Sequence, residues 1–257
     1  MTELVDRTIA ALRAEIDTLV ALVKELADDQ LGTTSGAAEW TVAQALSHLG
    51  SGAEIGRAPV ARAAGETVAQ EDNQAVWARW DAATPRAQAD GFLEHNARWL
   101  ETVEALSAQQ RSTLTVDLGF LPEPVPLVTA LGMRLNEVAN HSWDVRVAFD
   151  DTAEVADDSS ATLLELYRGP LEFMLGFLAK PAELAAPASV AVPGAGLVIG
   201  DAVTVADVPS APDATFHGSA GAVIRLVNGR LKAPYEAGVT VDGSVTLDDL
   251  RRVFPGF

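Results

Sequence analysis

Apolar residues recur at intervals of three and four through the first segment of the chain, which is the spacing of one buried helix face. This stripe consists of Val5, Ile9, Leu12, Ile16, Leu19, Val23 and Leu26. A second stripe lies between about residues 86 and 107 and consists of Phe92, Trp99, Val103 and Leu106. The pattern predicts amphipathic helices whose apolar faces pack on one another.

Two more helices are predicted in the same part of the chain. Thr41 can cap a helix together with Gln44, and Trp40 precedes them at the position of a hydrophobic staple. The other helix is predicted from about residue 126 to residue 149, after an extended connection over 112–125. Four long helices in one segment predict a helical bundle, and bundles often hold metal sites between facing helices.

The pattern changes after Asp150-Asp151. A helix is predicted over 159–179, bent or interrupted at Gly169-Pro170. Short runs rich in valine and alanine then alternate with Gly, Pro and Asp, which is typical of strands. These runs are 189–192, 197–199, 202–208, 214–217 and 239–241, with helical patterns at 219–227 and 247–254. The predicted fold class is α+β, with a helical bundle over 1–152 and a smaller α+β domain over 153–257.

Composition and charge exclude several classes of function. The formal charge of −18 over 257 residues, without a basic run, argues against binding to nucleic acid or to an anionic membrane. The longest uncharged stretch, 184–200, is broken by proline and glycine and is not expected to span a bilayer. Charged residues near the N-terminus do not fit a signal peptide, so we expect a cytoplasmic protein.

The chain contains no cysteine. Disulfides, thiolate metal ligands and a cysteine nucleophile are therefore excluded within this sequence. Any thiol chemistry would need a thiol supplied from outside the chain.

The candidate chemistry lies in the predicted helix over 126–149. Glu137 and His141 stand four residues apart, which puts a carboxylate and an imidazole on one helix face. His48 lies in the helix that begins near Thr41. Two histidines and one carboxylate would hold a divalent metal and leave coordination positions open, which suits catalysis. The alternative is a surface ion pair between Glu137 and His141, with His48 bonded to a neighbouring group.

Asp144 closely follows His141 in the same predicted helix. Its carboxylate could accept a hydrogen bond from a ligating histidine and fix the tautomer of that histidine. The alternative is a solvated acid in the last helical turn. His95 has no partner at helical spacing and is interpreted as ordinary. His217 is interpreted as structural, and the alternative is that it lines a cleft.

The sequence resembles a known family at two motifs in the first half. Trp-Thr-Val-x-x-x-Leu-x-His-Leu begins at Trp40, and Glu-x-x-x-His-x-Trp-Asp-Val begins at Glu137. Together they resemble the DinB-like metalloenzymes and, more closely, the mycothiol-dependent maleylpyruvate isomerase family. The second half resembles the C-terminal domain of that family, which is similar to sterol-carrier-like α+β folds. Its motifs are Gly218-Ser219-Ala220, Asn228-Gly229-Arg230 and the segment from Val239 to Gly243.

This resemblance implies that His48, Glu137 and His141 are metal ligands, that the metal is zinc, and that mycothiol is the cosubstrate. A thiol bound to zinc loses its proton near neutral pH and becomes a nucleophile. It would then form an S-conjugate, as in a transferase, or leave after a cis–trans rotation, as in an isomerase. The resemblance also implies that Arg230 could bind a substrate carboxylate.

The segment between the two metal motifs is acidic and offers few arginines for a dicarboxylate such as maleylpyruvate. This favours conjugation of a less charged electrophile. The expected partners are a small electrophile and a low-molecular-weight thiol, and the chain is expected to be a monomer or a homodimer. Two alternatives remain at this stage: a DinB-like metalloprotein that uses another thiol or water, and a non-enzymatic protein that binds an apolar ligand.

Overall fold

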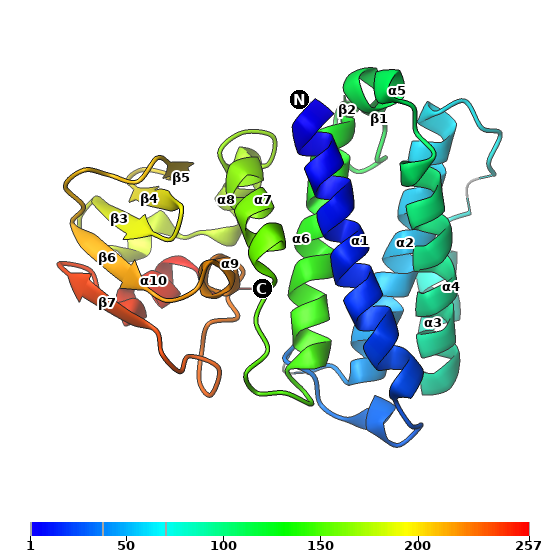
Figure 1. The fold of residues 1–257 in the computed structure, drawn as a ribbon, viewed down its shortest axis with the longest axis horizontal. Coiled ribbons are helices and arrows are strands. Elements are labelled where there is room, and N and C mark those ends of the chain that lie inside the picture. The colour runs from blue at the N-terminus through cyan, green and yellow to red at the C-terminus, as the bar shows by residue number, and fades with distance from the viewer. Residues whose placement is uncertain (1, 38, 70, 257) are drawn as a thin grey trace. The chain divides into compact units, whose positions relative to one another are not determined.

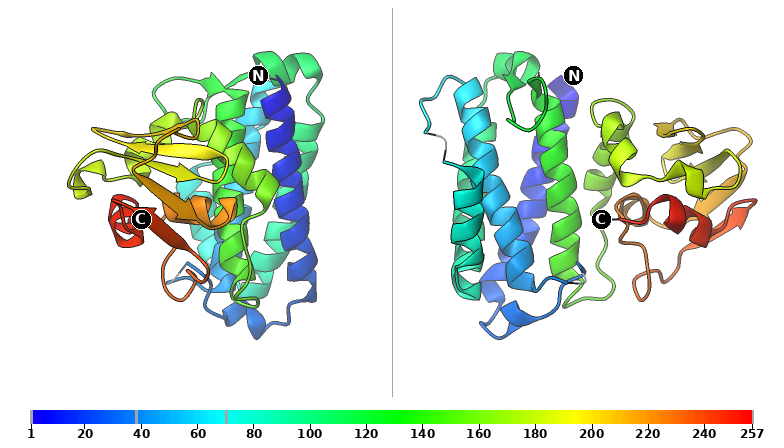
Figure 2. Two further views of the ribbon diagram at one scale, coloured as in Figure 1. Left: turned by 60° about the vertical axis from the view of Figure 1, so that its left-hand side comes forward. Right: turned by 180° about the vertical axis from the view of Figure 1, so that it is seen from behind.

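Four long helices form the first part of the chain in the computed structural model, which describes residues 2–37, 39–69 and 71–256 (Figure 1). They are α1 (Thr2–Glu25), α2 (Val42–Ala63), α4 (Pro85–Glu104) and α6 (Leu127–Arg146). Helix α2 packs against α4, while α6 packs against both α1 and α2 (Figure 2). The predicted helical bundle is confirmed.

The apolar stripes seen in the sequence form the core of this bundle. The α1 stripe from Val5 to Leu26 is buried, as is the α4 stripe that contains Phe92 and Trp99. The start of α2 follows the predicted signal, because the side chain of Thr41 accepts a hydrogen bond from the backbone N–H of Gln44 and the Gln44 side chain accepts one from the backbone N–H of Thr41. This cap fixes where α2 begins, and therefore which turn carries His48.

Two short helices of the bundle were not predicted, α3 (Asn73–Asp81) and α5 (Ala108–Thr113). Helix α3 buries only Val76 and Trp80, and α5 buries no side chain, so neither carries an apolar stripe. The extended connection predicted over 112–125 contains the end of α5. It then forms a small antiparallel pair between β1 (Thr115–Val116) and β2 (Val125–Pro126).

Trp80 attaches α3 to the bundle. Its ring fills the space that a side chain at Gly50 of α2 or Gly91 of α4 would occupy. A Cβ added to Gly50 would stand 2.2 Å from Trp80 Cη2, and one added to Gly91 would stand 2.7 Å from the same atom. The indole Nε1 donates a hydrogen bond of 2.6 Å to Glu54. Two glycines thus make room for one tryptophan between α2 and α4.

The rest of the chain is a mixed sheet covered by helices. The strand order is β5-β4-β3-β6-β7, with β3 and β6 parallel and the other neighbours antiparallel. The strands are β3 (Ala188–Val192), β4 (Ala195–Ile199), β5 (Val203–Ala206), β6 (Ala214–His217) and β7 (Thr240–Gly243). The helices are α7 (Asp157–Tyr167), α8 (Glu172–Leu178), α9 (Ala220–Val227) and α10 (Leu247–Val253). The predicted α+β class is confirmed.

The helix predicted over 159–179 is interrupted where the sequence indicated. Helix α7 ends at Tyr167 and α8 begins at Glu172, with Gly169-Pro170 between them. Proline at that position cannot supply a helical N–H and clashes with the preceding turn. The chain divides into two compact units, Met1–Ala153 and Glu154–Phe257. None of the helices in the described ranges has an apolar stretch long enough to cross a bilayer.

Candidate metal centre

His48, Glu137 and His141 come together in the first unit. His48 Nε2 lies 2.8 Å from Glu137 Oε2, and His141 Nε2 lies 3.7 Å from the same oxygen. One ligand atom from each residue lies within 4.8 Å of the others. Among the residues that the structure describes, these three form the one such group of histidines and acids. The packing of α2 against α6 therefore brings together two residues of one helix and one residue of the other.

Two of the three side chains are exposed to solvent. The side chains of His48 and Glu137 are 40% and 44% exposed, whereas the side chain of His141 is only 11% exposed. His141 therefore lies deepest, and His48 and Glu137 form the accessible edge. A metal held here would keep coordination positions within reach of a ligand, as catalytic sites do.

Asp144 fixes the orientation of His141. Its Oδ2 lies 2.8 Å from His141 Nδ1, and its side chain is completely buried. The backbone carbonyl of Asp144 also accepts a hydrogen bond of 2.7 Å from the N–H of Gly36. A buried carboxylate at this distance favours the proton on Nδ1, so that Nε2 presents its lone pair toward Glu137. The alternative of a solvated acid in the last helical turn is wrong, because the bundle encloses Asp144.

Trp40 also belongs to this site, which its predicted position as a hydrophobic staple does not indicate. Its ring packs against both histidines. The ring centroids lie 5.2 Å from His48 and 5.4 Å from His141, and the second pair is nearly parallel at 20°. The two imidazoles themselves meet edge to face, with centroids 4.7 Å apart. The indole therefore limits the rotation of both candidate ligands.

The donor atoms fit a divalent metal. Bonds of about 2.0–2.2 Å to nitrogen and oxygen put neighbouring donors of a tetrahedral site about 3.4 Å apart. The 2.8 Å and 3.7 Å separations lie on either side of that value. Two imidazole nitrogens and one carboxylate oxygen suit zinc and other divalent transition metals. The triad could bind a metal ion.

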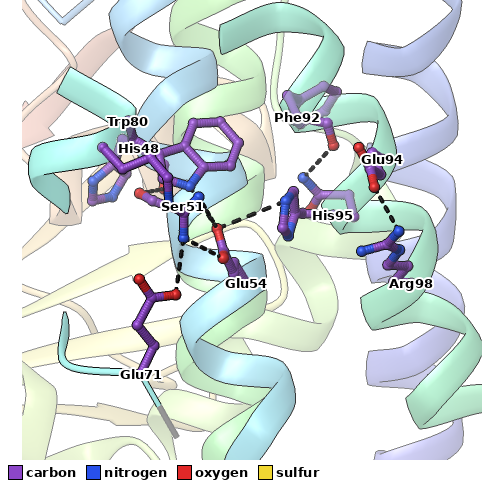
Figure 3. Close-up of polar contacts among 11 residues, drawn as sticks. His48, Ser51, Glu54, Glu71, Trp80, Phe92, Glu94, His95 and Arg98 are labelled. Atoms are coloured by element: carbon purple, nitrogen blue, oxygen red, sulfur yellow. Dashed lines mark hydrogen bonds and ion pairs between the residues drawn. The ribbon is translucent and has the colours of Figure 1, made fainter. Parts of the chain in front are cut away.

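His95 has a partner that the sequence did not reveal. Figure 3 shows His95 of α4 and Trp80 of α3 turned toward Glu54 of α2. His95 Nε2 lies 3.7 Å from Glu54 Oε2, and its ring meets the Trp80 ring edge to face. Arg79 donates a 2.6 Å hydrogen bond to the same carboxylate. Glu54 and His95 border a cavity of about 230 Å³ that His48 does not line.

Burial and neighbouring groups have opposing effects on the pKa values of Glu54 and His95. Burial disfavours the charged form of Glu54, but hydrogen bonds from Arg79 and Trp80 outweigh it, so the pKa of Glu54 lies below its usual value. Burial lowers the pKa of His95, and the nearby carboxylates of Glu54 and Glu94 only partly oppose it. The neutral form of His95 is therefore favoured by its surroundings.

Arg230 and His217 lie in the second unit, whereas the candidate metal ligands all lie in the first. Arg230 follows α9, and its Nη1 donates a hydrogen bond to the backbone carbonyl of Asn228. His217, at the end of β6, lies 3.1 Å from Asp242 of β7, and both side chains are exposed. The role of Arg230 toward a substrate stays a prediction.

Known proteins share this architecture. The family described as "Mycothiol maleylpyruvate isomerase N-terminal domain" matches residues 12–146. The crystal structure of the mycothiol-dependent maleylpyruvate isomerase superposes with a TM-score of 0.62 at 18% identity, over 94% of this chain and 94% of that chain. A histidine-to-alanine mutant of the mycothiol-dependent maleylpyruvate isomerase gives a TM-score of 0.59, with the same identity and coverage. No curated protein matches the chain significantly.

Proposed function

Because the chain belongs to the family of the mycothiol maleylpyruvate isomerase N-terminal domain, we propose that it is a metal-dependent enzyme that uses a low-molecular-weight thiol. The observation that carries this proposal is the group formed by His48, Glu137 and His141. Three protein donors with an exposed edge provide a place for a metal and for one further ligand.

Zinc is the metal that the proposal favours, and mycothiol is the thiol. A divalent metal in the triad would lower the pKa of a thiol that coordinates to it, so that the thiolate forms near neutral pH. The absence of cysteine from the chain is consistent with a nucleophile that arrives with the cosubstrate. The name of the similar isomerase structure supports mycothiol as this thiol.

Each site residue has a distinct role in this proposal. His48, Glu137 and His141 hold the metal, and Asp144 keeps the proton of His141 on Nδ1. Trp40 packs against both imidazoles and limits their movement. Arg230 would bind a carboxylate of the substrate through its guanidinium.

The thiolate would form a carbon–sulfur bond with an electrophilic carbon of the substrate. If a leaving group departs or a proton is taken up, the product is an S-conjugate and the enzyme is a transferase. If the addition is to a double bond, rotation about the resulting single bond followed by expulsion of the thiolate gives a cis–trans isomer. Both outcomes need the same metal site, and the proposal includes both.

Metal analysis and thiol selectivity test this function. The purified wild type is expected to carry stoichiometric zinc, and His48→Ala and His141→Ala are expected to lose it. The zinc-loaded wild type is then given a haloaromatic electrophile with mycothiol, glutathione or bacillithiol, and with maleylpyruvate in a separate assay. Turnover with mycothiol that depends on metal supports the proposal. Equal, metal-independent rates with all three thiols contradict it.

A further inference from the structure

Arg134 links the two helices that carry the candidate metal ligands. It lies on α6, three residues before Glu137. Its Nη2 donates a hydrogen bond of 2.7 Å to the backbone carbonyl of Leu49, the residue that follows His48 on α2. A single side chain thus joins the α6 turn beside Glu137 to the α2 turn that holds His48.

The third helix of the bundle holds this guanidinium in place. The same Nη2 donates a 2.7 Å hydrogen bond to Oδ1 of Asn96 on α4, and Asn96 is itself completely buried. Asn96 is fixed in turn by a hydrogen bond from its Nδ2 to the carbonyl of Phe92. The guanidinium carbon lies 5.8 Å from the centre of the Trp99 ring. Three helices therefore define one position for the guanidinium.

Helix α2 has space for this contact only because residue 52 is glycine. A Cβ at Gly52 would stand 2.8 Å from Nη1 of Arg134, closer than a Cβ normally approaches another atom. Gly52 lies one turn after His48 on the same helix. An alanine at position 52 would therefore push the guanidinium away from Leu49 and Asn96.

The charge of Arg134 is costly at this position. Among the described residues no carboxylate forms an ion pair with it, and its Nε is buried without a hydrogen-bond acceptor. Burial lowers the pKa of Arg134 to about 10, while the charge of Glu137 opposes that shift. Arg134 is only partly exposed, and a cation held partly out of water without a paired anion costs stability. Stability alone therefore does not account for arginine here.

We propose that Arg134 is a positioning residue of the candidate metal centre, which sets the separation between His48 on α2 and Glu137 on α6. This role of Arg134 rests on the proposed function only for the presence of a metal, and it needs no particular thiol or substrate. Loss of a group that orients a metal ligand typically lowers metal affinity by about 10- to 100-fold.

The test measures metal binding to the full chain. Zinc affinity is determined by competition with a chromophoric chelator, and Co²⁺ is used as a second probe because its visible absorption reports ligand geometry. Arg134→Met removes the guanidinium, Arg134→Lys keeps the charge, and Gly52→Ala displaces the guanidinium without removing it. Arg86→Met is the control. Arg86 also donates a hydrogen bond to a backbone carbonyl of the bundle, that of Leu26, but neither residue is near a triad residue in the sequence.

We expect Arg134→Met and Gly52→Ala to weaken zinc binding about 10- to 100-fold and to shift the Co²⁺ spectrum, with partial recovery in Arg134→Lys. The metal-free melting temperature of Arg134→Met is expected to fall, because the buried Oδ1 of Asn96 loses its donor, so Arg86→Met separates a loss of stability from a loss of zinc affinity. Arg86→Met is expected to change stability and leave zinc affinity and the Co²⁺ spectrum unaltered.

Two results with the variants would overturn the proposal. One is unchanged zinc affinity and an unchanged Co²⁺ spectrum in Arg134→Met. The other is an equal loss of zinc affinity in Arg86→Met, which would indicate a general loss of stability. A wild type that binds zinc but turns over no thiol would contradict the proposed function and leave the role of Arg134 standing. A wild type that binds no metal would contradict both.

Discussion

Asp144 Oδ2 lies 2.8 Å from Nδ1 of His141, and the side chain of Asp144 is completely buried while that of His141 is 11% exposed. This pair shows how the bundle prepares the candidate metal centre. The carboxylate reaches the imidazole from inside the protein, so the opposite ring nitrogen faces Glu137. Such a contact orients a ligand before a metal arrives and increases its basicity.

Replacement of Asp144 should therefore weaken metal binding without removing a ligand. We expect Asp144→Asn to lower zinc affinity by about 10- to 100-fold, because a neutral amide holds the His141 tautomer less firmly. Isothermal titration of metal-free protein with zinc measures the change. Asp242→Asn is the matched control, since Asp242 also pairs with a histidine, the exposed His217. Equal affinities of Asp144→Asn and wild type would contradict the assigned role.

Metal binding should stabilise the first unit. A ligand that binds the folded state and not the unfolded state raises the free energy of unfolding by an amount that grows with its concentration. We expect EDTA to lower the melting temperature of the wild type and zinc to restore it, as measured by differential scanning calorimetry. His141→Ala should show no difference between zinc and EDTA. A wild-type melting temperature that does not respond to zinc would speak against the site.

Trp40 should contribute to metal affinity through the two imidazoles that it contacts. Aromatic pairs of this kind are worth about 0.5–1.5 kcal/mol, which corresponds to an effect of about two- to tenfold. We expect Trp40→Ala to lower zinc affinity within this range and Trp40→Phe to retain most of it. Trp77→Ala is the control, because Trp77 is 42% exposed and lies on α3. An unchanged zinc affinity in Trp40→Ala would contradict a role of Trp40 in holding the imidazoles of His48 and His141.

His95 should make the stability of the protein depend on pH below neutrality. Its pKa is lowered in the folded state from the ordinary value of 6.5, so below that value the unfolded chain binds more protons at this residue. The stability that neutral His95 contributes is therefore lost as the pH falls through 6.5. Glu54, whose pKa is also lowered, adds a loss of the same sign at lower pH.

We expect His95→Gln to reduce the fall in melting temperature between about pH 7 and pH 5.5. Thermal unfolding of the metal-free protein across this range measures the effect, which keeps metal loss from His48 and His141 out of the comparison. His217→Gln is the control, since its side chain is 52% exposed. An unchanged slope in His95→Gln would contradict the assignment to this residue.

Gly50 should not tolerate a side chain. A Cβ at this position would stand 2.2 Å from Trp80 Cη2 and 3.1 Å from Phe92 Cα, so either the indole or the α4 backbone must move. We expect Gly50→Ala to destabilise the protein by about 1–3 kcal/mol, as overpacking of a core usually does. Urea denaturation measures the difference. Gly32→Ala is the control, because nothing lies within 4 Å of a Cβ there.

The sequence revealed most of the fold through periodicity. The apolar stripe from Val5 to Leu26 and the alternation in the second half have a local cause, because burial on one face requires a repeat along the chain. Helices α3 and α5 were missed because they bury little or nothing and so have no repeat. The interruption at Gly169-Pro170 was predicted because proline acts on its own turn.

By itself, the sequence determined which residue types could hold a metal and which helices carry them. The spacing of Glu137 and His141 put both on one face of a helix, His48 was the third candidate ligand, and the motif resemblance implied that all three bind a metal. Only the tertiary structure decided that α2 and α6 bring these three side chains within 4.8 Å, that Asp144 is enclosed behind His141, and that Trp40 covers both rings.

Arg134 and the Glu54–His95 pair depend entirely on the tertiary structure. Arg134 is separated from Asn96 by 38 residues and from Leu49 by 85, and His95 meets Glu54 from another helix. The spacing of residues within one helix does not predict such contacts, because they depend on how different helices pack against each other. The candidate ligands could therefore be identified from the sequence, whereas the residues that support them became visible only in the folded bundle.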